Sequence, residues 1–181
     1  FPAFALLGVV CALSAIIFLR SVEFTNDVIS RIPVPQWLKP MGGGLCVGII
    51  ALAFPQVLGV GYEATDIALN GQYELAILVA LIAAKTAATA ICIGAGFGGG
   101  VFSPSMFIGA MVGGAFGIIA TQLFPDLSSG HSAYTLVGLG AVSGAVLGAP
   151  ISTILIVFDC MVHEEASREI EEGAVSNEKA K

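Results

Sequence analysis

Long apolar stretches with almost no charge recur along this chain, and they restrict it to one class of fold. A helix needs about 20 predominantly apolar residues to cross the hydrocarbon core of a bilayer. Five stretches of about that length or longer are present: 1–19, 37–54, 75–93, 101–124 and 133–162. Charged residues make up 11% of the sequence, whereas about 25% is usual in a soluble domain. The sequence therefore predicts an all-α, polytopic bundle of membrane helices.

The last apolar stretch, 133–162, is too long for one straight membrane span. Gly148-Ala149-Pro150 interrupts it near its middle. Proline lacks an N–H group and favours the first turn of a new helix. We therefore expect two short helices, at about 133–147 and 150–161, with a single kinked helix as the alternative. Short apolar segments broken by glycine and proline are typical of transporter binding sites.

The chain divides into an apolar part and a polar tail. Residues 1–162 are expected to form one transmembrane domain, and residues 163–181 are charged and expected to be a solvated tail. The helix that begins in the first apolar stretch is predicted to continue as an amphipathic helix to about Ile32, because Pro33 stops it.

Composition and motifs exclude several classes of function. The net charge of −6 provides no basic surface for nucleic acid. The four cysteines show no CxxC or Cys/His spacing, so no metal site is indicated, and each is interpreted as a small apolar residue. No Ser/His/Asp set or carboxylate pair points to an enzyme.

Glycines recur at every fourth residue in three places. Small residues at this spacing let helix backbones approach closely in lipid, so these glycines are interpreted as packing faces. The three sets are Gly109, Gly113 and Gly117; Gly140, Gly144 and Gly148; and Gly44 and Gly48.

The glycines of the segment "GAGFGGGVFSP", residues 94–104, need another explanation. They fit the GxGxxG pattern of dinucleotide-binding proteins, but the strand, the βαβ unit and the acidic residue that the pattern requires are missing. Pro104 suits the first turn of a helix, where N–H groups lack intrahelical partners and attract anions. Glycines before that turn would let an ion approach the backbone. The residues alone leave two alternatives, an anion site or a tight loop whose amides bind other backbone groups.

Three segments of the sequence resemble parts of the CLC family of chloride channels and proton-coupled chloride antiporters. "GGGVFSPSMFIGAMVGGAFG" resembles the GxFxP region of that family. "LVALIAAKTAATAICIGAG" looks like the preceding helix, and "YTLVGLGAVSGAVLGAPISTILIVFD" looks like the next two short helices. The resemblance covers about residues 1 to 160.

The resemblance implies a fold and a site. The chain looks like most of the second half of an inverted-repeat fold with short, tilted and broken helices. The backbone N–H groups of Val101 and Phe102 would coordinate chloride, and the turn would be shaped by Gly99, Gly100, Ser103 and Pro104. Chloride would be the ligand, with protons as a second substrate in antiporters and no cofactor. The full-length protein would be a multi-pass homodimer in the plasma or inner membrane.

The chain departs from the family pattern in several places. The first-half motifs GSGIP and G[KR]EGP are absent, and so is the pore-lining tyrosine of the last family helix. Phe1 is not preceded by Met, so we interpret the N-terminus as an interior cut. A chain of this kind would contribute part of one anion site. Channel and antiporter both stay open as functions.

Two further questions stay open at this stage. Lys85 lies in the middle of an apolar stretch, where it either pairs with other groups or attracts anions. The chain as a whole could also be a non-transporting helix bundle or scaffold, or belong to a different transporter with a similar Gly-rich broken helix.

Overall fold

The computed structural model of this chain describes residues 2–33, 35, 37–59, 61–71, 73–123, 131–156 and 158–159. The predicted tail, 163–181, lies outside the described residues. Within them, every regular element is helical, so the all-α prediction is confirmed. The elements are α1 (Pro2–Arg31), α2 (Lys39–Ala53), the 3₁₀ turn η1 (Pro55–Val57), α3 (Tyr62–Leu69), α4 (Leu75–Gly94), α5 (Phe102–Leu123) and α6 (His131–Leu147). A short helix at 150–156 follows.

Three of the described helices, α1, α4 and α5, are long and apolar enough to cross a membrane. Helices α2 and α6 are apolar but shorter. Helix α1 has 30 residues, which corresponds to about 45 Å at 1.5 Å per residue. That length exceeds the roughly 30 Å hydrocarbon core. The predicted continuation of the helix beyond the first apolar stretch is confirmed as far as Arg31.

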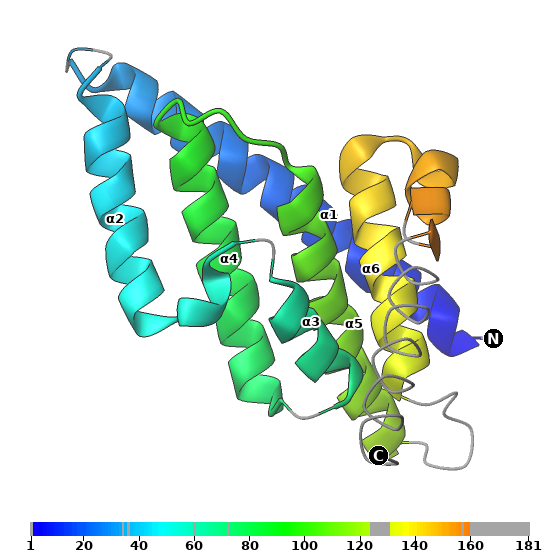
Figure 1. The fold of residues 1–181 in the computed structure, drawn as a ribbon. Coiled ribbons are helices and arrows are strands. Elements are labelled where there is room, and N and C mark those ends of the chain that lie inside the picture. The colour runs from blue at the N-terminus through cyan, green and yellow to red at the C-terminus, as the bar shows by residue number, and fades with distance from the viewer. Residues whose placement is uncertain are drawn as a thin grey trace, which may run out of the picture.

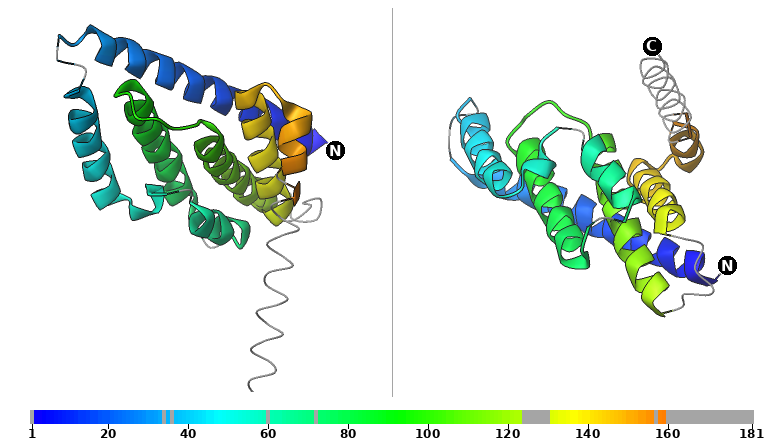
Figure 2. Two further views of the ribbon diagram at one scale, coloured as in Figure 1. Left: turned by 45° about the horizontal axis from the view of Figure 1, so that its top comes forward. Right: turned by 60° about the horizontal axis from the view of Figure 1, so that its bottom comes forward.

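Helix α1 runs diagonally across one face of α4, α5 and α6 (Figures 1 and 2). Against α5 and α6 it does so through one stripe of side chains, because residues three or four apart lie on the same helix face. The stripe and its partners on α5 and α6 form one buried cluster: Leu7, Cys11, Ala15, Phe18, Ile108, Val112, Tyr134 and Val142. The opposite face of α1 is apolar and exposed, with Leu6, Leu13 and Ile17 each more than half exposed.

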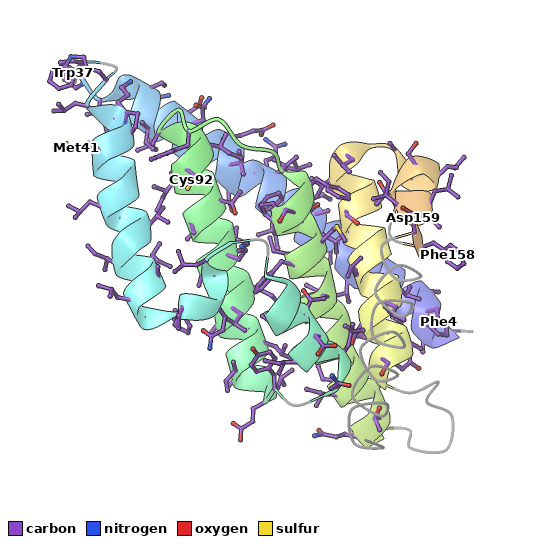
Figure 3. The ribbon with its side chains drawn as sticks, in the orientation of Figure 1. Phe4, Trp37, Met41, Cys92, Phe158 and Asp159 are labelled. Atoms are coloured by element: carbon purple, nitrogen blue, oxygen red, sulfur yellow. The ribbon has the colours of Figure 1, made fainter. Side chains whose placement is uncertain are left out.

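A second buried cluster joins η1, α3, α4 and α5. Its members are Val57, Ala64, Ala68, Leu78, Leu81, Ala88, Phe107 and Met111. Helix α2 packs beside α4 and η1. Figure 3 shows Trp37 and Met41 at the N-terminal end of α2, where both side chains are exposed.

Helices α5 and α6 make the closest contact in the bundle, and glycines form it. A side-chain carbon at Gly109 would lie 2.6 Å from the carbonyl oxygen of Gly138. One at Gly113 would overlap the carbonyl oxygen of Tyr134 and lie 2.8 Å from Cα of Thr135. These neighbours are backbone atoms, so they have little freedom to move aside. The predicted packing role of Gly109 and Gly113 is therefore confirmed.

The set at Gly140, Gly144 and Gly148 is not the face that α6 presents to α5. A side-chain carbon at Gly140 or Gly148 would meet no atom within 4 Å. A side-chain carbon at Gly144 would lie 3.3 Å from Cα of Pro150 in the following helix. The contact with α5 uses Gly138 instead, because α6 faces α5 with the side that carries Tyr134 and Thr135. Four-residue spacing identifies a face of small residues but not the neighbour that covers it.

The interruption after α6 is as the sequence predicts. Helix α6 ends at Leu147, Gly148 has a φ of +66°, and a new helix begins at Pro150. The alternative of a single kinked helix is wrong, since residues 148 and 149 are not helical.

A Schellman motif ends helix α4. The N–H of Gly96 donates to the carbonyl of Ile93 at 3.1 Å, and that of Phe97 donates to the carbonyl of Cys92 at 3.0 Å. Gly96 has a φ of +87°, in the left-handed region that side chains disfavour. This glycine therefore serves to stop the helix.

We expect Gly113→Ala to destabilise the folded protein and Gly140→Ala to leave it unchanged or slightly more stable. The added methyl at position 113 meets backbone atoms of α6, and overpacking of this kind costs about 1–3 kcal/mol. The methyl at position 140 meets open space and removes a helix glycine, worth roughly 0.5–1 kcal/mol. Thermal unfolding of both variants in detergent measures the difference. Equal melting temperatures would contradict the packing assignment.

A second matched pair tests the end of α4. Gly96→Ala forces an alanine into the left-handed region, which costs about 1–2 kcal/mol. Gly98→Ala adds the same methyl only two residues later, where φ is not positive and no atom lies within 4 Å. We expect the first variant to melt at a lower temperature than the second. If Gly98→Ala is the less stable one, the assigned helix ending is incorrect.

Candidate functional site

The predicted site residues lie in the turn that joins the end of α4 to the start of α5 (Figure 1). The first helical hydrogen bond of α5 runs from the N–H of Ser105 to the carbonyl of Val101, at 3.0 Å. Val101 is therefore the N-cap residue, and Phe102 is the first residue of the helix. Pro104 falls in the first turn, as its missing N–H favours. The prediction that a helix begins here, with Pro104 in its first turn, is therefore confirmed.

Three consecutive amides at this helix start have no acceptor among the described residues. Within the described part of the chain, the N–H groups of Val101, Phe102 and Ser103 donate to no backbone or side-chain oxygen. The Ser105 hydroxyl does not cap them, because it donates to the carbonyl of Phe102 at 2.6 Å. Free amides at a helix N-terminus carry the positive end of the helix dipole. The arrangement can therefore hold an anion.

In the described structure, no packing contact requires glycine at positions 98, 99 and 100. A side-chain carbon at Gly98 or Gly99 would meet no atom within 4 Å, and one at Gly100 would lie 4.0 Å from the nitrogen of Phe102. None of the three has a positive φ. Neither close packing nor backbone strain within this chain requires glycine here, so the segment leaves its backbone uncovered.

A cavity of about 360 Å³ lies against this turn. Gly98, Gly99, Gly100, Ser103 and Pro104 line it from one side, and Lys85, Thr89 and Cys92 line it from α4. Figure 3 shows Cys92 on α4, toward the end of the helix that leads into the turn. Val101 and Phe102 are not among the lining residues, and the side chain of Val101 packs against the α1–α5–α6 cluster instead.

Lys85 is buried and paired, so the first of its two interpretations is confirmed. Its Nζ donates to the carbonyl oxygens of Val57 and Gly59 at 2.8 Å each. It also lies 5.0 Å from the ring centroid of Phe107. The side chain thereby ties the loop after η1 to α4 and α5. Sequence reasoning could not identify these acceptors, because backbone carbonyls more than 25 residues away carry no sequence signal.

Apart from Lys85 and Cys92, no ionisable side chain of the described residues lines this cavity. Among the described residues, no group of three or more His, Cys, Asp or Glu could hold a metal ion. Cys11 is buried in the α1–α5–α6 cluster, whereas Cys46 is exposed on α2. The predicted role of a small apolar residue therefore fits Cys11 best.

A comparison with protein families places the chain in a known family. A family model described as voltage gated chloride channel matches residues 1–164, which includes every described helix. The match covers most of the chain and extends from α1 through the turn before α5 to the helix at 150–156. An apolar helical bundle with this match is an integral membrane protein, and the chain belongs to the CLC family of chloride channels and transporters.

Proposed function

We propose that this chain forms part of a pathway that carries chloride across a membrane, with the backbone N–H groups of Val101 and Phe102 coordinating the ion. The observation that carries the proposal is the helix start itself. Its first amides have no acceptor in the described structure, and the glycines before it are not required by packing. Gly99, Gly100, Ser103 and Pro104 shape the turn that presents these amides.

Amide donors suit an ion that must enter and leave. A hydrogen bond to an ion contributes about 1.5–3 kcal/mol, and the dipole of α5 adds a partial positive charge. Conduction requires binding that is favourable enough for entry but weak enough for release. Partial charges on the backbone meet that requirement better than a lysine or arginine that binds the ion directly.

The wider assembly that we propose is the one that the family resemblance implies. Chloride is the ligand, and no cofactor takes part. The protein is a multi-pass homodimer in the plasma or inner membrane, with the bilayer as its surroundings and no nucleic-acid partner. The proposal covers a channel and a proton-coupled antiporter, since both would use an amide site of this kind.

The test removes one donor without changing a side chain. Replacing the amide between Val101 and Phe102 by an ester deletes the N–H of residue 102 and keeps the phenylalanine ring. We expect the chloride affinity of the full-length protein, measured by calorimetry in detergent, to fall roughly ten- to a hundredfold, the equivalent of one lost hydrogen bond to an ion.

Val101→Ile serves as the control, because it keeps the amide and the apolar side chain. Its chloride affinity should equal that of the wild type. An ester protein that folds and binds chloride as tightly as the wild type would show that these amides do not coordinate the ion. Failure of the wild-type protein to bind or transport chloride would overturn the proposed function as a whole.

A further inference from the structure

A buried hydroxyl without a hydrogen-bond partner lines the cavity beside the turn. Thr89 on α4 is 8% exposed, and it faces the cavity together with Ser103 and the glycines at 98–100. Among the described residues, no hydrogen bond joins its hydroxyl to another group. A buried hydroxyl normally has such a partner, because leaving it without one costs free energy. The hydroxyl of Thr89 therefore needs an explanation outside the packing of this chain.

The usual partner of a threonine inside a helix is the carbonyl oxygen four residues earlier. Thr65, Thr121 and Thr153 each donate to that carbonyl, at 3.0, 2.8 and 2.9 Å. Within the described structure, Thr89 does not make the corresponding bond to the carbonyl of Lys85. Its hydroxyl is therefore turned away from the backbone of its own helix.

The oxygen of Thr89 is open to the cavity. In the described part of the chain, every side-chain nitrogen or oxygen that is completely covered has a hydrogen-bond partner. The Thr89 oxygen has none, so it is not completely covered, although most of the residue is buried. The cavity of about 360 Å³ is the open space that Thr89 lines. A ligand in this cavity can therefore reach the hydroxyl.

Few other side chains on the cavity wall can bind a small ligand. The ammonium of Lys85 already donates to the carbonyls of Val57 and Gly59. The other hydroxyl on the wall belongs to Ser103, at the start of α5, and it too makes no hydrogen bond among the described residues. A water molecule occupies about 30 Å³, so the cavity has room for about ten waters or for an ion that keeps part of its hydration shell.

We infer that Thr89 is a specificity-determining residue whose hydroxyl donates a hydrogen bond to an anion in this cavity, in place of one water of its hydration shell. A hydroxyl can rotate to donate to an anion, and it carries no charge that would hinder release. This inference rests on the proposed function, since the ion is the one that the amides at the start of α5 would coordinate. It adds a side-chain donor from α4 to those amides.

The same hydrogen bond distinguishes between anions. Chloride concentrates its charge on one atom and accepts strong hydrogen bonds, whereas thiocyanate spreads the same charge over three atoms and accepts weaker ones. Because water in the cavity can partly replace the hydroxyl, we expect its loss to weaken chloride binding by about 3- to 10-fold. Thiocyanate binding should change less than about twofold. The preference for chloride over thiocyanate should therefore fall.

The experiment compares three variants of the full-length protein by calorimetry with chloride and with thiocyanate. Thr89→Val has the shape of threonine but no hydroxyl, and Thr89→Ser keeps the hydroxyl. Thr86→Val removes a hydroxyl from the same helix at a position that does not line the cavity. Chloride affinity should fall about 3- to 10-fold in Thr89→Val and stay at the wild-type value in Thr89→Ser and Thr86→Val.

A stability measurement distinguishes an anion donor from a structural hydroxyl. Replacing a hydroxyl that has no protein partner by an apolar group of the same shape costs little or stabilises the fold. We therefore expect Thr89→Val to melt in detergent at or above the wild-type temperature in the absence of chloride, while it binds chloride more weakly. Thr89→Ala, which adds no bulk to the helix, provides a second hydroxyl-free variant if the valine protein does not fold.

The outcomes separate this inference from the proposed function. Wild-type chloride affinity in a folded hydroxyl-free variant would overturn the inference and leave the amide site standing. A lower melting temperature of Thr89→Val, with chloride and thiocyanate affinities reduced equally, would show that the hydroxyl binds a protein group and would overturn it as well. Absence of chloride binding in the wild type would instead overturn the proposed function.

Discussion

The close approach of α5 and α6 is the contact on which the rest of the bundle depends. Gly109, Gly113 and Gly138 bring the two backbones together without intervening side chains. Lipid supplies no hydrophobic force between helices, so van der Waals contact of this kind holds membrane helices together. The joined pair then offers one continuous surface, and the stripe of α1 that begins at Leu7 packs across it.

Helix α5 connects this scaffold to the candidate site. Its glycines face α6, while its first turn presents the amides of Val101 and Phe102. Helix α4 ends in a defined hydrogen-bonded motif at Gly96. The turn that follows is therefore anchored at one end by α4 and at the other by α5. A binding site supported by rigid elements keeps its geometry better than one on a long loop. The uncovered glycines are therefore confined to a short segment between two well-packed helices.

Much of the local structure could be predicted from sequence because its causes are local. Apolar stretches of spanning length predict the helices, and Gly148 with Pro150 predicts the break after α6. Pro104 predicts the start of α5 within two residues. The family of the chain was predicted from the resemblance of this and neighbouring segments, and the family match over residues 1–164 confirms it.

The sequence by itself determined that this chain is a set of membrane helices with a glycine-rich helix start, because hydrophobicity, proline and glycine act on the residues next to them. Only the tertiary structure decided which glycines meet a neighbour, with Gly138 in place of Gly140. It also decided that Lys85 binds the carbonyls of Val57 and Gly59 while lining the cavity at the turn. These features join residues more than 20 positions apart, and backbone acceptors carry no side-chain signal, so they exist only once the helices have packed.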